Sequence, residues 1–226
     1  MKTPTRNASV AAKTYRSAIS VARADLFGIT SDPQMPLHLI EDTGVPFLGF
    51  AGQDYREGGL LLLAINPGAG NDKLRKRPLQ DAELIPLILA FKASDPDEIE
   101  STFAAMSSSY IKQAKTWNLW GIVGPVLEAS RKAPEEVAFA NIFPYRTYKD
   151  RKPHHLPLLN AVGQIAKPLI SGLKPGTVVA LGKKAGEALE GEQFSGRYFV
   201  VPRTNGDRYV SAEAGKVLEA IRQHAA

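Results

Sequence analysis

The chain alternates between short apolar runs and longer stretches in which apolar residues recur at helical spacing. The apolar runs are six or seven residues long, as buried strands are, and they cover residues 60–65, 136–142, 177–182 and 197–202. Helical patterns cover residues 8–24, 79–93, 118–132, 155–173, 183–190 and 211–225. The acidic stretch at 95–100 predicts a further helix N-terminus. Because strands and helices alternate, the pattern predicts a three-layer α/β/α fold with a central four-stranded, mainly parallel sheet.

The first 57 residues follow a different pattern from the rest of the chain. After the helix expected over 8–24, the next segment is interrupted by Pro33, Pro36, Gly44, Pro46, Gly49 and Gly52. Such spacing predicts loops with at most short strands. We find no repeat, no low-complexity segment and no clear internal boundary. We therefore expect a single domain over 1–226, with residues 1–57 as an N-terminal helix and loop extension.

Composition narrows the class of protein. The 226 residues include no cysteine, which excludes disulfides, thiol nucleophiles, cysteine-ligated zinc and iron–sulfur clusters. No apolar run approaches the roughly 18–20 residues that span a bilayer, and the N-terminus lacks the apolar core of a signal peptide. His154 and His155 are adjacent, but no acidic cluster accompanies them. We expect a cytoplasmic monomer with no membrane association, no metal and no cofactor.

The basic residues are concentrated after the predicted strands. The net charge is only +5, but twelve of the 28 lysines and arginines lie in four segments that each follow a strand. They are Lys73, Arg75, Lys76 and Arg77; Arg146, Lys149, Arg151 and Lys152; Lys183 and Lys184; and Arg203 and Arg208. Because the carboxyl ends of parallel strands meet at one edge of a sheet, these segments should lie together. Lysine and arginine are common in solvated loops, which explains any one of these segments by itself. The four segments together, with Tyr145 and Tyr148 among the basic residues of the second, favour a nucleic-acid partner.

The first apolar run ends in the sequence Asn-Pro-Gly-Ala-Gly. Asn66 stands at the strand tip, and it is followed by Pro67, Gly68, Ala69 and Gly70. The glycines permit a sharp turn and a close approach of backbone N–H groups to a phosphate. The pattern is neither a Walker loop nor a dinucleotide-binding fingerprint. By spacing alone, a plain structural turn explains it at least as well as a ligand site.

Three stretches resemble the uracil-DNA glycosylase superfamily. The sequence AINPGAG is similar to its first active-site motif, in the Asn-Pro-Gly form of the mismatch-specific uracil/thymine and single-strand-selective branches. VAFANIFPYRT resembles the strand and loop that carry its pyrimidine-reading Asn, and TVVALGKKAGEAL resembles its third strand and the following helix. The resemblance implies an enzyme that flips uracil out of DNA and hydrolyses the N-glycosidic bond in base excision repair.

The resemblance also implies roles for particular residues. Asn66 would orient the attacking water, the turn over 67–70 would contact the substrate, and Asn141 would read the base through its amide. An aromatic side chain would stack on the flipped base, and Phe143, Phe50 and Tyr55 are the candidates. The DNA backbone would be bound by Lys73, Arg75, Arg146, Lys149, Arg151, Lys183 and Arg208.

The chain departs from the superfamily after the fourth strand. Where the family carries a His-Pro-Ser motif, whose His helps the uracil anion to leave, this chain reads Val201-Pro202-Arg203. Arg203 and Asn205 are the candidates for the missing donor, and His154 or His155 could also reach the site. Arg208 or Tyr209 are candidates for a wedge residue. The departure keeps two alternatives open: a domain that binds damaged or single-stranded DNA without cleaving it, and a small-molecule nucleotide or nucleoside hydrolase.

Overall fold

The computed structural model describes residues 6–27, 44–68, 77–147, 152–203 and 210–225. The strands are β1 (Gly49–Ala51), β2 (Leu60–Ala64), β3 (Val137–Asn141), β4 (Thr177–Leu181) and β5 (Arg197–Val201). The helices before β3 are α1 (Arg6–Ile19), α2 (Arg23–Phe27), α3 (Arg77–Ala93), α4 (Ile99–Ala114), α5 (Trp120–Ser130) and the 3-10 turn Pro134–Glu136. The later helices are α6 (His155–Ala161), the π-helical turn Val162–Ala166, α7 (Lys167–Leu173), α8 (Lys183–Ala188) and α9 (Ala212–His224).

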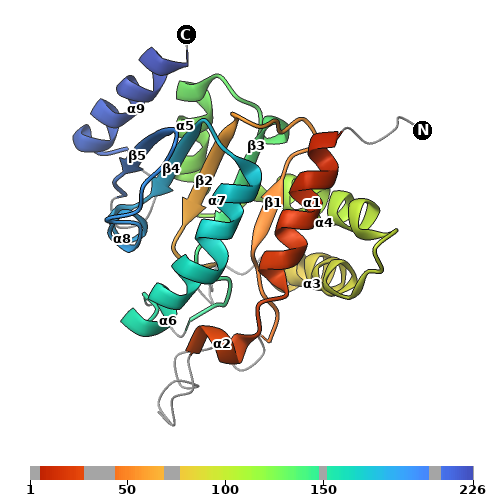
Figure 1. Ribbon diagram of the computed structural model, residues 1–226. Helices are drawn as coiled ribbons and strands as arrows, with labels where there is room; N and C mark the ends of the chain where they lie inside the picture. The colour runs from red at the N-terminus through yellow and green to blue at the C-terminus, as the bar shows by residue number, and fades with distance from the viewer. Residues whose placement is uncertain (1–5, 28–43, 69–76, 148–151, 204–209, 226) are drawn as a thin grey trace.

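The strands form one mostly parallel sheet in the order β1-β3-β2-β4-β5. The pairs β3–β2, β2–β4 and β4–β5 are parallel, and β1 pairs with β3 in the antiparallel direction. The predicted three-layer α/β/α class is confirmed, as Figure 1 shows, because helices lie on both faces of the sheet. Of the described helices, none is long and apolar enough to cross a membrane.

The expected number of strands was wrong, because β1 adds a fifth. This strand has only three residues, so its apolar alternation is too short to stand out from the surrounding prolines and glycines. Gly49 allows it to pack closely, since its φ is +130° and a Cβ there would lie 2.1 Å from the Phe139 carbonyl oxygen. Only glycine tolerates both conditions.

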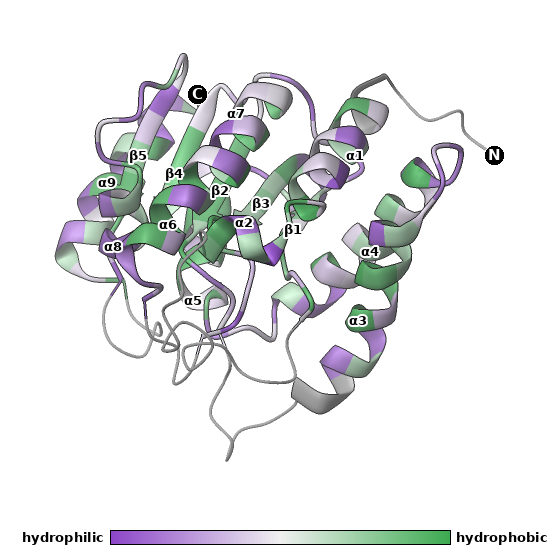
Figure 2. Cartoon of the chain, turned by 60° about the horizontal axis from the view of Figure 1, so that its bottom comes forward, coloured by the Kyte–Doolittle hydropathy of each residue, from purple (hydrophilic) through white to green (hydrophobic). Residues whose placement is uncertain are grey.

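The helical layers are distributed unevenly around the sheet. In Figure 1, α1 and α7 run side by side across one face, and α5 and α9 lie together near β5. α4 packs on β1 and α3 packs on α4, beyond the β1 edge of the sheet. Figure 2 shows β2 and β3 mostly in apolar green, with hydrophilic residues on the surrounding helices. The described residues of β2 and β3 are all buried, so the core lies around the centre of the sheet.

Tyr15 of α1 links the first 57 residues to the sheet. Its side chain is fully buried, and its hydroxyl lies 2.7 Å from the Phe50 carbonyl oxygen and 2.9 Å from that of Phe139. The single hydroxyl proton is therefore shared between β1 and β3. Burial raises the pKa of Tyr15, so the hydroxyl stays protonated as a donor.

We expect Tyr15→Phe to lower the free energy of unfolding by about 1–3 kcal/mol, since buried carbonyls lose their donor. Urea denaturation followed by circular dichroism measures the change. Tyr198→Phe is the matched control, because the Tyr198 hydroxyl is only half-buried and makes one long contact of 3.4 Å with the Gly186 carbonyl. Equal losses of stability in the two variants would contradict a special role for the Tyr15 hydroxyl.

Candidate functional site

The candidate site lies at the carboxyl ends of β2 and β3. Ala64, the last residue of β2, is in register with Asn141, the last residue of β3. Beyond the strands the pairing continues, since the Ile142 N–H donates to the Ala64 carbonyl and the Phe143 N–H to that of Ile65. The segments that contain the two candidate asparagines are therefore held next to each other.

Asn66 is half-buried and is anchored through its amide nitrogen. Its Nδ2 donates to the Thr147 Oγ1 at 2.9 Å. Thr147 is itself buried, so the loop after β3 fixes the orientation of a side chain that follows β2. Within the described part of the chain, no hydrogen bond reaches Oδ1 of Asn66. This carbonyl oxygen can accept a hydrogen bond from a water or a ligand.

Asn141 is buried and is anchored in the same way. Its Nδ2 donates to the Phe47 carbonyl oxygen at 2.8 Å, and its backbone N–H donates to the Leu48 carbonyl at 2.7 Å. A primary amide has two N–H donors and one acceptor oxygen. The bond to Phe47 uses one donor, which leaves one N–H and Oδ1 without partners among the described residues.

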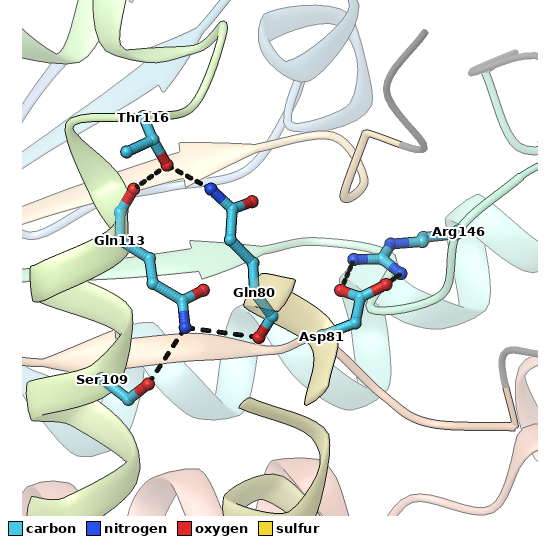
Figure 3. Close-up of polar contacts among 6 residues, drawn as sticks. All are labelled: Gln80, Asp81, Ser109, Gln113, Thr116 and Arg146. Carbon is cyan, nitrogen blue, oxygen red and sulfur yellow. Dashed lines mark hydrogen bonds and ion pairs between the residues drawn. The ribbon is translucent and has the colours of Figure 1, made fainter. Parts of the chain in front are cut away.

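Arg146 differs from the exposed phosphate-binding cation that was expected. Its guanidinium makes a two-point contact with the Asp81 carboxylate of α3 at 2.7 and 2.8 Å, which Figure 3 shows. The guanidinium carbon also lies 3.8 Å from the centre of the Phe47 ring. With a side chain only 9% exposed, Arg146 is held in the interior by its partners. Tyr110 is buried close to this pair, and burial raises its pKa even though Arg146 acts to lower it.

The three aromatic candidates for base stacking are core residues in this structure. Phe143 is 1% exposed and packs edge-on against Phe27 and Tyr145. Phe50 stacks on Phe139, and the Tyr55 hydroxyl donates to the Leu173 carbonyl. Each ring is surrounded by the protein, so none of these three presents a free face to solvent.

Those of the remaining candidates that the structure describes lie at the same edge, because β2 to β5 are parallel. Pro67 is half-buried and Gly68 is exposed directly after Asn66. Lys183 begins α8 after β4, and its exposed amine pairs with Glu213 at 3.1 Å. Arg203 is exposed beyond β5 and its side chain runs beside Gly182. Ala69, Gly70, Lys73, Arg75, Lys149, Arg151, Asn205 and Arg208 lie outside the described residues.

Phe47, Asp81 and Thr147 are the residues of this site that sequence reasoning missed. Each of them bonds to a partner that is distant in the sequence. Phe47 and Asn141 are 94 positions apart. Asp81 and Arg146 are 65 positions apart, and Thr147 and Asn66 are 81 positions apart. Only Thr147 carried a signal, since it falls inside the loop that resembles the glycosylases.

The described residues contain no group of three or more histidines and carboxylates that could hold a metal ion. No protein-family model matches this chain, and no curated protein matches it.

Proposed function

We propose that this protein is a DNA glycosylase that flips uracil out of DNA and hydrolyses its N-glycosidic bond. One observation carries the proposal: two asparagines lie at the carboxyl ends of neighbouring parallel strands. In each, a hydrogen bond to the protein fixes Nδ2, while no donor among the described residues reaches Oδ1. Because the two amides are preoriented at adjoining strand ends, one of them can position a water while the other recognises a base. The three sequence stretches that resemble uracil-DNA glycosylases include both residues.

Asn66 would position the nucleophile in this reaction. Its Oδ1 accepts a hydrogen bond from a water, whose oxygen attacks C1′ of the flipped nucleotide. The C1′–N1 bond breaks, its electron pair leaves with uracil N1, and the proton lost by the water passes to solvent. A neutral amide is too weak a base to take that proton. The rate enhancement must therefore come from the orientation of the water and from electrostatic stabilisation.

Asn141 would read the base with the groups that Phe47 leaves available. The second N–H donates to uracil O4, and Oδ1 accepts from uracil N3–H. Cytosine presents an amino donor and an unprotonated N3 at these positions, so both contacts become unfavourable. A buried site whose polar groups are left unpaired by the wrong base discriminates strongly.

Arg203 would stabilise the departing uracil anion or an adjacent phosphate. It follows β5 at the edge where β2 and β3 also end. A guanidinium keeps its charge at all physiological pH values. Lys184, exposed at the start of α8 beside the Lys183–Glu213 ion pair, would extend the positive charge along that edge toward a DNA backbone.

A second candidate function is DNA recognition without cleavage. It is favoured by Val201, an apolar residue that is fully buried where the resembled family carries its catalytic His. A valine cannot donate a hydrogen bond to the uracil O2. In this case the two asparagines would recognise a flipped base, and no bond would break.

The deciding experiment is uracil release from a labelled oligonucleotide that contains one deoxyuridine, assayed as single and double strands in parallel. Alkali cleaves the strand wherever a base has been lost. We expect cleavage at the uracil and none at thymine or cytosine in the same position. DNA binding without cleavage would favour the second function. Binding that is absent, or that does not weaken as salt increases, would contradict both and leave a small-molecule substrate.

A further inference from the structure

We infer that Phe47, Arg146 and Asp81 form a positioning unit that orients the Asn141 amide; its consequence for uracil recognition rests on the proposed function. We call these three residues the Phe47 clamp. They come from the segment before β1, the loop after β3 and the first turns of α3. None of them touches the substrate in this arrangement, because each acts through the next residue.

The first link of the Phe47 clamp is the two-point ion pair between Asp81 and Arg146. The two terminal guanidinium nitrogens of Arg146 donate to the two carboxylate oxygens of Asp81. The Asp81 side chain is 17% exposed and the Arg146 side chain is 9% exposed. A planar guanidinium held at two points has a fixed orientation as well as a fixed position. A lysine or a single-point contact would not define the plane of the group.

The second link joins that plane to Phe47. The guanidinium carbon of Arg146 lies 3.8 Å from the ring centre, within the range of a cation–π contact. The Phe47 side chain is 3% exposed, and the Phe47 N–H donates to the Pro144 carbonyl at 2.7 Å. The ring and the backbone of Phe47 are thus both attached to the loop after β3, two residues before β1 begins.

The third link is the Phe47 carbonyl, which accepts the hydrogen bond from Asn141 Nδ2 at 2.8 Å. The direction of that carbonyl determines which way the Asn141 amide turns. If Phe47 shifts, the Asn141 Nδ2 loses its fixed acceptor, and the Oδ1 and second N–H of the amide lose their orientation. The Phe47 clamp therefore controls whether Asn141 can make two simultaneous contacts to a base edge.

A neighbouring network provides a matched control. Gln80, adjacent to Asp81 in α3, donates to the Thr116 hydroxyl, and its carbonyl accepts from Gln113 of α4 at 3.3 Å. Figure 3 shows this network beside the Asp81–Arg146 pair. It also ties α3 to its surroundings, but its hydrogen bonds lead to α4 and to the residues just after it, and not to Phe47. Substituting Gln80 perturbs the same turn of α3 while leaving the Phe47 clamp intact.

The test is hydrogen exchange of the Asn141 side-chain N–H groups, measured by NMR on the ¹⁵N-labelled full chain. Their resonance is assigned by its loss in Asn141→Asp. In Asp81→Asn we expect exchange at least about tenfold faster than in the wild type, which corresponds to about 1.4 kcal/mol of lost protection. Asp81→Glu should restore part of the protection, and Gln80→Ala should leave it unchanged. If Asp81→Asn does not fold, Phe47→Leu, which keeps the carbonyl and removes the ring, gives the same readout.

Unchanged exchange in a folded Asp81→Asn protein overturns the inference, as does equal acceleration in Gln80→Ala. The uracil assay adds the functional consequence: release per bound complex falls by about tenfold in Asp81→Asn, with DNA affinity retained. If the wild type releases no uracil, the proposed glycosylase fails while the exchange data still decide the Phe47 clamp. If release is strong but insensitive to Asp81→Asn, the proposed function stands and the positioning role fails.

Discussion

Replacing Asn66 by alanine is expected to reduce uracil release by about 100-fold or more, the typical cost of removing one preorganised polar group from a reacting centre. The Thr147 hydroxyl holds Nδ2 of Asn66, so Oδ1 has a set direction before substrate arrives. Alanine removes the acceptor and leaves the water without orientation. Single-turnover release from a deoxyuridine oligonucleotide measures the effect directly, because it isolates the chemical step from product release.

The same Asn66→Ala variant should bind DNA nearly as well as the wild type, since the contacts that we propose to the DNA backbone involve other residues. Gln193→Ala is the control, because Gln193 is exposed in the segment between α8 and β5, at the end of the sheet where β5 begins and opposite the strand ends of the candidate site. A variant that loses binding but releases uracil normally per bound complex would assign Asn66 to DNA contact and exclude it from catalysis. Loss of release in Asn66→Ala alone also excludes a contaminating glycosylase as its source.

The second large effect is expected at Asn141. Asn141→Leu keeps a similar volume but removes both base contacts and the donor to the Phe47 carbonyl. We expect uracil release to fall by about 100-fold or more and the preference for uracil over cytosine to be largely lost, because that preference depends on paired polar groups. The change in preference is measured as the ratio of kcat/KM for oligonucleotides that differ only in carrying uracil or cytosine. Where no cytosine release is detected, the ratio is a lower limit.

Asn160→Leu is the control for a loss of stability unrelated to base reading. The Asn160 amide donates to the Leu26 carbonyl at 3.0 Å, so this substitution also removes a side-chain bond to a distant backbone group. It should leave the ratio of uracil to cytosine release unchanged. If both variants reduce release equally and neither alters the ratio, Asn141 is structural and does not read the base.

The sequence predicted those elements whose signal is local. Each of the four expected strands is found within one residue of its predicted limits, because buried parallel strands are continuous apolar runs with sharp ends. The helix at 155–173 is also found, although residues 162–166 form a π-helical turn within it. The predicted helix over 8–24 divides into α1 and α2, and α4 was recognised only by its acidic start.

Of the candidate site, the sequence predicted the two asparagines but not the residues that hold them in place. Asn66 and Asn141 are identifiable because each ends an apolar run, and the parallel sheet brings those ends together. Phe47 and Asp81 could not be identified, since their roles depend on contacts 94 and 65 positions away and on a three-residue strand. Phe143 illustrates the reverse error: its position in a motif-like loop suggested a ligand contact, but the packing of Phe27 determines its surroundings.

The central position of β2 has a consequence for synthesis of the chain. Its two neighbours in the sheet are β3 and β4, and Val137, the first residue of β3, follows Ala64 by 73 positions. At about 5–20 residues per second, a translating ribosome therefore releases β2 about 4–15 s before its first partner. During that interval four leucines and an alanine have no strand to pair with. The nascent chain must be kept from aggregating at this segment until β3 emerges.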